Sequence, residues 1–271
     1  MIFGAITNSW RQQLESRDLM DLVEQAGQLG ARHIELRQTC LGRCEDGSGE
    51  DWRPNLDRLA GLVDAHPSLT FDLAMALPCL TQMIDPQGEG FQAALAGAKL
   101  VGKAQAHLRL VDPRPFDAPW ESPEDIPAEA LNVAASATEA ARQSVVMSIE
   151  NSGQPIRSLA MLVKAARARM SPAHAPYLGL CPDPTNQLRR FPGSDPLEEL
   201  DALPLDMIKI VHFKQLRNGE PHGSVDDGDL NCLRMRDILN AKGYAGPAIM
   251  EIPPARDVFD NLAASFRYLG S

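Results

Sequence analysis

The chain of 271 residues is 44% apolar and 23% charged, a composition ordinary for a folded globular protein, which excludes extensive disorder. Its formal net charge of −10 opposes binding to nucleic acid or to an anionic membrane, because both normally require clustered Lys and Arg. The N-terminus lacks a secretory signal pattern and no apolar run is long enough to cross a bilayer, so we expect a cytoplasmic protein.

Eight short apolar runs recur along the chain, and longer segments between them have the Leu and Ala spacing of amphipathic helices. This alternation is typical of βα units on a parallel sheet. The predicted strands are 2–7, 33–37, 69–75, 107–111, 144–150, 177–181, 208–213 and 247–252. The predicted helices include 17–30, 93–105, 127–143, 157–170 and 258–270.

The regular spacing of these units favours one closed barrel. The step from residue 33 to 69 is 36 positions, from 107 to 144 it is 37, and from 177 to 208 it is 31. An open doubly wound sheet is the alternative, but it usually carries a Gly-rich turn after its first strand, where this chain reads TNSWRQQ. We therefore predict an α/β protein with a single (β/α)8 TIM barrel as one domain over residues 1–271.

Three polar segments rich in Pro, Gly or acidic residues are predicted to be extended loops. They are 111–127, 188–196 and 217–231, after the fourth, sixth and seventh strands. Loops that follow barrel strands cover the face on which active sites lie.

Four residues with metal-ligand chemistry end the last four predicted strands. They are Glu150, Asp183, His212 and Glu251. From 150 to 183 is 33 positions, from 183 to 212 is 29 and from 212 to 251 is 39, so each step is close to one βα unit. Because neighbouring strand ends meet at the barrel mouth, we expect these side chains to converge on one ion. A cap or an ion pair explains any one of them alone, but four in successive units favour a metal site.

The ligand set indicates which ion would bind. Three carboxylates and one imidazole favour Mn²⁺ or Mg²⁺, with Co²⁺ or Zn²⁺ as alternatives. Cys40 and Cys44 are an alternative ligand pair, but no second pair with zinc spacing accompanies them, so we expect structural roles for both. The odd total of five cysteines without a CxxC pair fits a reduced compartment.

At these residues the chain resembles the xylose isomerase-like barrels, which include sugar epimerases of the tagatose 3-epimerase type, hydroxypyruvate isomerase, inosose dehydratase and endonuclease IV. The resemblance extends through all eight units, and its motifs lie in the second half of the chain. They are IEN at 149–151, CPDPTN at 181–186, VHFK at 211–214 and MEI at 250–252.

The resemblance implies roles for the two glutamates beyond metal binding. In isomerase and epimerase members, the first and last metal-binding carboxylates are also the acid/base pair, which here implies Glu150 and Glu251. They would move a proton on a hydroxyketone through a metal-stabilised enediolate. Family members often form dimers or tetramers, so the resemblance allows a homo-oligomer.

Further residues are expected near the mouth. Lys214 follows His212 by two positions, so both point to the same side, and it either acts on substrate as a general acid or pairs with Glu251 or Asp183. The expected substrate-binding residues are Arg109, Arg217, Asn186, Trp10 and Asn8. Simple loop packing is the alternative for Trp10, and an ion pair with an arginine across the barrel is expected for Glu35.

Asn186 departs from the epimerase pattern. Sugar epimerases of this family commonly carry His three residues after the metal-binding Asp183, and this chain carries Asn there. The same departure, with the acidic charge, opposes endonuclease IV-like DNA repair. The DPxN form with HxK on the seventh strand looks closer to dehydratase-like and sugar isomerase-like members.

Two reactions follow from this reading. The leading hypothesis is a metal-dependent isomerase or epimerase of a small carbohydrate-like substrate, and the alternative is a lyase that dehydrates a keto-cyclitol or related keto-sugar. A barrel that only binds a ligand is a third class, which the paired carboxylates disfavour.

Overall fold

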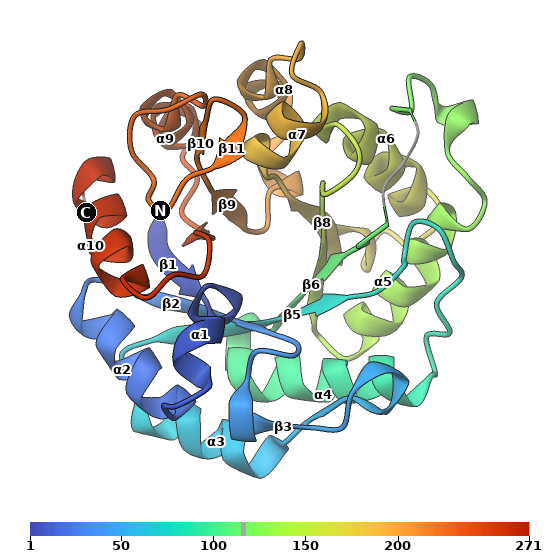
Figure 1. Cartoon of the computed structure of the whole chain (residues 1–271). Helices are drawn as coiled ribbons and strands as arrows, with labels where there is room; N and C mark the ends of the chain where they lie inside the picture. Colours follow the sequence, from blue (N-terminus) through green and yellow to red (C-terminus); the bar gives the residue numbers. More distant parts are fainter. Residues whose placement is uncertain (115–117, 271) are drawn as a thin grey trace.

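Eight parallel strands form the centre of the protein and helices surround them (Figure 1). The computed structural model describes residues 1–114 and 118–270. The strands are β1 (Ile2–Ile6), β2 (His33–Arg37), β5 (Thr70–Ala76), β6 (His107–Val111), β7 (Val146–Glu150), β8 (Leu178–Cys181), β9 (Val211–Phe213) and β12 (Pro247–Met250). All eight predicted strands are therefore present, and two of them, β2 and β6, have the predicted bounds.

The strand order closes the sheet into a TIM barrel. Neighbours run β8-β7-β6-β5-β2-β1-β12-β9, so strands next to each other in the chain pair in space. Between β8 and β9 the contact is thinner: the backbone N–H of Lys209 donates to the carbonyl of Leu180 (2.9 Å), and that of His212 donates to Pro182 (3.1 Å). The predicted fold class is confirmed, with its least bonded seam between two of the ligand-bearing strands.

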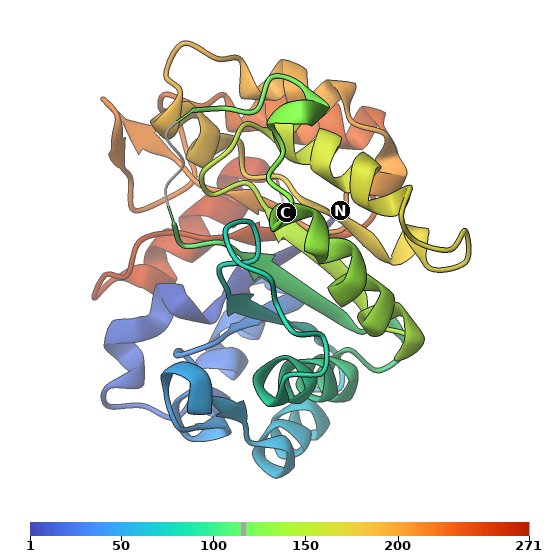
Figure 2. The ribbon, with the colours of Figure 1, turned by 90° about the vertical axis from the view of Figure 1, so that its right-hand side faces the viewer.

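Helices cover the outside of this barrel, as the side view shows (Figure 2). Each predicted helical segment overlaps one of them, although α4 and α6 begin before the predicted start. The Asp18 side chain caps α2 by accepting from the N–H of Met20 (3.0 Å). The helices are α1 (Arg11–Leu14), α2 (Leu19–Gln28), α3 (Leu56–Ala65), α4 (Glu89–Gly102), α5 (Val133–Arg142), α6 (Ile156–Arg167), α7 (Pro184–Arg190), α8 (Pro196–Ala202), α9 (Cys232–Ala241) and α10 (Val258–Leu269).

The predicted loops differ from the structure in detail. Helix α7 extends into the predicted loop 188–196, because Asp183 caps it and Pro184 occupies its first position. The predicted loop 217–231 contains part of a hairpin of β10 (Leu216–Arg217) and β11 (Glu220–Pro221), and a second hairpin joins β3 (Glu45–Asp46) to β4 (Arg53–Pro54). Within the predicted loop 111–127, residues 115–117 lie outside the described residues.

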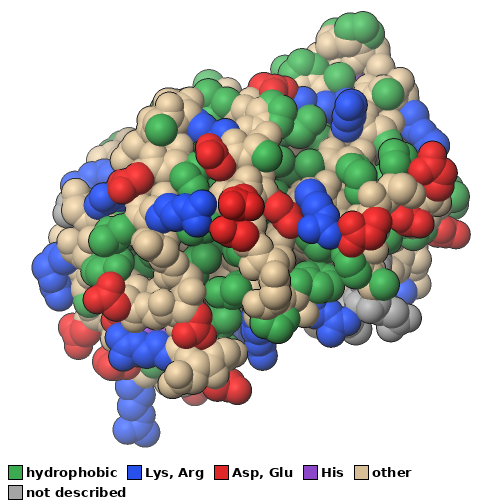
Figure 3. Space-filling model, turned by 90° about the horizontal axis from the view of Figure 1, so that it is seen from above, with side chains coloured by type: hydrophobic (Ala, Val, Ile, Leu, Met, Phe, Trp, Pro, Cys, Tyr) green, Lys and Arg blue, Asp and Glu red, His purple; other side chains and the backbone are tan. Residues whose placement is uncertain are grey.

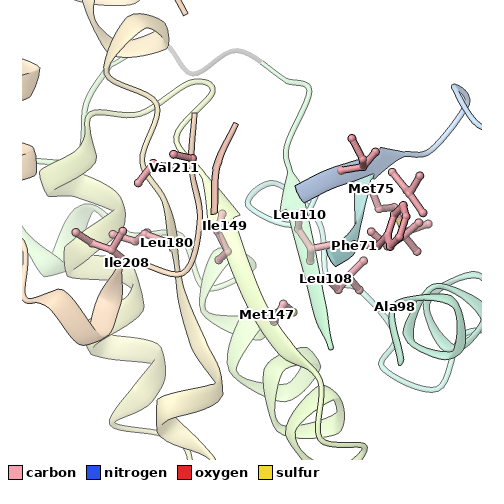
Figure 4. Packing of buried hydrophobic residues seen from close by; sticks show 14 of the residues in the cluster. Phe71, Met75, Ala98, Leu108, Leu110, Met147, Ile149, Leu180, Ile208 and Val211 are labelled. Carbon is pink, nitrogen blue, oxygen red and sulfur yellow. The ribbon is translucent and has the colours of Figure 1, made fainter. Parts of the chain in front are cut away.

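Apolar side chains fill two separate spaces. The larger cluster packs the outer face of the sheet against the helices, and Figure 4 shows part of it, including Leu108 and Leu110 of β6 with Met147 and Ile149 of β7. A smaller cluster contains Ile6, Cys181, Ile210 and Ile249. Ile210 and Ile249 each precede a ligand candidate by two positions, so this apolar group lies inside the barrel below the candidate site.

The surface in Figure 3 mixes acidic and basic side chains across one face, with small apolar areas between them. Across the described ranges, none of the helices combines the length and apolarity needed to span a bilayer.

Candidate metal and active site

Four side chains from the ends of β7, β8, β9 and β12 converge at the barrel mouth. Glu150, Asp183, His212 and Glu251 each offer one ligand atom, and these atoms all lie within 4.8 Å of one another. Asp183 and His212 are fully buried at 0% exposure, while Glu251 keeps 17% of its side chain open to solvent. The four residues named from their spacing therefore form one cluster.

Local structure holds Asp183 in place from both sides. Its backbone N–H donates to Oδ1 of Asn151 (2.6 Å), whose amide donates back to the Asp183 carbonyl (3.0 Å). Its Oδ1 accepts from the N–H of Asn186 as the N-cap of α7 (2.9 Å). This leaves Oδ2 free to face the cluster, so one carboxylate both starts a helix and serves the site.

Lys214 reaches into the centre of the cluster. Its Nζ lies 2.7 Å from Oδ2 of Asp183, 2.9 Å from Oε2 of Glu251 and 3.6 Å from Oε1 of Glu150. The ion-pair interpretation of Lys214 is thus realised, and its side chain remains 19% exposed toward the mouth.

Three polar atoms of the cluster are buried without a well-directed hydrogen bond among the described residues. They are Oδ2 of Asp183, Nδ1 of His212 and Oε2 of Glu251. Nδ1 of His212 is only 2.7 Å from that oxygen of Glu251, so the atoms are close while their bonding directions miss one another. Buried acceptor atoms grouped this closely favour a positive charge, which the Lys214 ammonium supplies to Asp183 and Glu251 and which a bound cation could supply to the whole group.

The charges of the network lead to the same conclusion. Its four carboxylates, which are the three ligand candidates and Glu35, face two permanent cations, Arg109 and Lys214. As a metal ligand His212 would be a neutral imidazole, and two negative charges would then remain for a divalent cation to balance. The residues present therefore fit a divalent metal ion by donor type and by charge.

A second layer of buried contacts orients the ligands. Nε2 of His212 donates to Oε2 of Glu35 (2.8 Å), so Nδ1 is the ring nitrogen that faces the cluster. The guanidinium of Arg109 donates to both Glu35 and Glu150. Glu35 and Arg109 are 0% and 1% exposed, so these contacts are shielded from water.

The pKa directions show a site that favours positive charge. Burial lowers the pKa of Lys214, but the carboxylates of Asp183 and Glu251 outweigh it and hold that pKa well above its ordinary value. Burial raises the pKa of Asp183, and the like charge of Glu150 adds to it. Burial also raises the pKa of Glu251, but the Lys214 charge prevails and leaves this carboxyl ionised at neutral pH.

Two asparagines touch the carboxylates from the mouth side. Nδ2 of Asn8 donates to Oε1 of Glu251 (2.7 Å), and Nδ2 of Asn186 donates to Oε1 of Glu150 (2.8 Å). Asn186 also accepts from Lys214 through Oδ1 (3.3 Å). Both predicted polar contacts therefore lie at the site, one on each of the two glutamates.

The other predicted substrate contacts lie differently. Trp10 is 1% exposed and stacks on Phe259 with ring centroids 5.5 Å apart, which is the loop-packing alternative. Arg217 is half-exposed on its hairpin and pairs with Asp226 (3.1 Å). Arg109 lies below the mouth and pairs with the carboxylates of Glu35 and Glu150. This arrangement suits a residue that holds Glu150 in position, and not the expected contact with substrate.

Sequence reasoning gave Glu35 an arginine partner but missed its bond to His212. The signal for it was the alternation of β2, which puts the polar residues His33, Glu35 and Arg37 on one face of the strand. Cys40 and Cys44 are buried thiols outside the cluster, in agreement with structural roles.

Comparison with known proteins points to one family. The family model for the xylose isomerase-like TIM barrel matches residues 23–269. No curated protein sequence matches the chain.

Solved structures with the same fold are distant in sequence. A probable 3-DHS dehydratase, AsbF, involved in petrobactin synthesis from Bacillus anthracis is 15% identical with a TM-score of 0.72, and the match covers 100% of this chain and 99% of that one. The IolI protein with a binding zinc atom is 15% identical with a TM-score of 0.69, over 99% and 95% of the two chains. D-allulose 3-epimerase from Methylomonas sp. in complex with D-allulose is 14% identical with a TM-score of 0.71, over 99% and 96%.

Proposed function

Because the chain belongs to the xylose isomerase-like TIM barrel family, we propose that it is a divalent-metal-dependent isomerase or epimerase of a small hydroxyketone or sugar. The observation that carries the proposal is the placement of Glu150 and Glu251. They come from separate strands, and both approach Nζ of Lys214 at the mouth, at 3.6 and 2.9 Å. A substrate carbon between them would have a carboxylate on each side.

Glu150, Asp183, His212 and Glu251 would hold the ion, Mn²⁺ or Mg²⁺ by donor set, with Co²⁺ or Zn²⁺ as alternatives. A bound ion would supply polarisation of the substrate carbonyl, which acidifies the neighbouring C–H. The solved structure of an epimerase with D-allulose supports a sugar-like substrate, and that of the IolI protein with a zinc atom supports a metal site.

The two glutamates would carry the proton. One ionised carboxylate would remove it from the carbon beside the carbonyl. The other, after taking up a proton from solvent, would return that proton to the opposite face or to the neighbouring carbon, and the first would then release its proton to solvent. Asn8 binds the oxygen of Glu251 that does not face the cluster, which keeps Oε2 directed inward. On Glu150, Arg109 binds Oε2, and Asn186 binds Oε1, the oxygen on the side of Lys214. Lys214 and, from the β10 hairpin, Arg217 are the proposed contacts for substrate oxygens.

Deuterium exchange tests this proposal. Mn²⁺-loaded protein should incorporate deuterium from D₂O beside the carbonyl of a ketose such as D-allulose, as followed by NMR. Glu150→Gln and Glu251→Gln should each lower the exchange rate by about 10²- to 10⁴-fold, the usual contribution of a positioned acid or base. Absence of exchange with every ketose and hydroxyketone tried would refute the proposal.

A metal-dependent lyase is the second candidate, and Lys214 is the observation that favours it. Its ammonium lies 2.9 Å from Glu251 with part of its side chain open to the mouth, where it could protonate a departing hydroxyl. The solved structure of a probable dehydratase with the same fold supports this alternative. Absorbance from a conjugated product separates the two reactions, and Lys214→Met should abolish that product while exchange at the α-carbon persists.

A further inference from the structure

Arg37 ends β2 at the barrel mouth, where no acidic side chain of the described residues forms an ion pair with it. It lies two positions after Glu35, so strand alternation places both on the inner face, with Arg37 one layer nearer the mouth. Its backbone N–H donates to Oγ1 of Thr7 (2.9 Å), which fixes this end of the strand beside the segment that carries Asn8. The residue is half-buried.

The guanidinium of Arg37 uses little of its bonding capacity. Among the described residues it makes one hydrogen bond, from Nη1 to the backbone carbonyl of Gln38 (2.8 Å), and no ion pair within 4.0 Å. An arginine has five N–H donors, so most of those of Arg37 remain available to a ligand. Arg109 on the layer below is, in contrast, bound by two carboxylates.

Arg37 is within electrostatic reach of the proposed proton-transfer pair. Burial and the charge of Arg109 lower its pKa, while the charges of Glu251 and Glu150 raise it. These influences agree with the position that strand alternation gives Arg37, at the same mouth as the two glutamates, and no ion pair within 4.0 Å joins it to them.

From these observations we propose that Arg37 binds a carboxylate of the substrate, which would then be a hydroxylated keto acid or a carboxylated keto-cyclitol. This inference rests on the proposed function and specifies its substrate class. The four carboxylates of the network described above, its two cations and a bound divalent ion would together be neutral. The charge of Arg37 would then be unmatched. One carboxylate matches that charge, a neutral sugar does not, and a phosphate dianion exceeds it. The planar fork of arginine also fits a carboxylate through two parallel bonds.

Calorimetry with two ring polyols tests the inference. Quinate carries a carboxylate and myo-inositol does not, and each is titrated into Mn²⁺-loaded protein. The wild type should bind quinate more tightly than myo-inositol. Arg37→Gln should weaken quinate binding by about 10- to 100-fold, the range for a lost charge-assisted hydrogen bond, and leave myo-inositol unchanged. Arg37→Lys keeps the charge but lacks the planar guanidinium, so its affinity for quinate should lie between those of the wild type and Arg37→Gln.

Arg32→Gln is the matched control, because Arg32 is exposed just before the opposite end of β2. Among the described residues its side chain bonds only to the backbone carbonyls of Gly27 and Ala31. Thermal melting of each variant shows whether the fold is kept. Equal affinity of the wild type for the two polyols, or an unchanged preference in Arg37→Gln, overturns the inference. Deuterium exchange into a neutral ketose, undiminished in Arg37→Gln, would uphold the proposed function while excluding this substrate class.

Discussion

Oε2 of Glu35 accepts a hydrogen bond from Nε2 of His212 at 2.8 Å, although the two residues are 177 positions apart in the chain. The bond crosses the barrel interior and leaves the other ring nitrogen facing the ligand cluster. A carboxylate behind a histidine ligand fixes its tautomer and raises its basicity. Glu35 is therefore expected to govern metal affinity without contacting the ion.

Glu35→Gln should lower Mn²⁺ affinity by about 10- to 100-fold, because an amide is a weaker acceptor for His212 and a weaker partner for Arg109. Isothermal titration with Mn²⁺ measures the effect. Glu89→Gln is the control, since the Glu89 side chain is 91% exposed and pairs with Arg53 at the surface. Equal affinities in the wild type and Glu35→Gln would remove this role from Glu35.

Metal loading should stabilise the fold. An ion that binds the native state at 100 times its dissociation constant adds about 2.7 kcal/mol to the free energy of unfolding, so chelation should lower Tm and Mn²⁺ should restore it. Asp183→Asn should lose this response while keeping α7, because Asn is also a good N-cap. A Tm that is insensitive to chelator in the wild type would argue against the site.

A buried network at the other end of the barrel predicts a pH dependence of stability. Oδ1 of Asp72 lies 3.0 Å from Nε2 of His33, and Oδ2 lies 2.6 Å from Nδ1 of His107. Burial raises the pKa of Asp72, but its hydrogen bonds from His107 and His33 outweigh this and hold the pKa below its ordinary value.

A depressed carboxyl pKa stabilises the fold above the unfolded value, about 3.9, and that contribution falls as the pH drops below it. Asp72→Asn should therefore cost roughly 1–3 kcal/mol at pH 7, and the difference from wild type should shrink below about pH 4. Urea unfolding at several pH values measures both. Asp46→Asn, at an exposed carboxylate on β3, should show no such loss, and a constant Asp72→Asn deficit down to pH 3 would contradict the linkage.

Gly4 on β1 lies where a larger side chain would clash with its neighbours. A Cβ at this position would lie 2.5 Å from the carbonyl oxygen of His33 and 2.7 Å from Cδ1 of Ile249. Backbone cannot yield as a flexible side chain can, so Gly4→Ala should destabilise the protein by about 1–3 kcal/mol. Gly61→Ala on α3, where nothing lies within 4 Å, should be neutral or slightly stabilising in the same thermal melts.

The sequence predicted the barrel strands well because each is an apolar run with a strong period. The hairpins β3–β4 and β10–β11 escaped prediction because two-residue strands have no period to detect. Helix α7 was partly assigned to a loop because its start depends on Asp183, which we interpreted only as a ligand.

The four ligand candidates followed from spacing, since each falls at a strand end. Spacing could not indicate how Arg109 would be used, because that depends on which residue across the barrel faces it. The structure places Glu35 and Glu150 there, one from β2 and one from β7. Pair contacts across a closed barrel join residues far apart in sequence, and no local pattern records them.

The thin seam between β8 and β9 has a mechanical consequence. Asp183 follows β8 and His212 lies on β9, so the two ligands stand on opposite sides of the barrel's weakest junction. An ion held by both ligands would link β8 to β9 and stabilise this junction. Hydrogen exchange should detect this as slower exchange of the Lys209 and His212 amides, which bridge the junction, when Mn²⁺ is added.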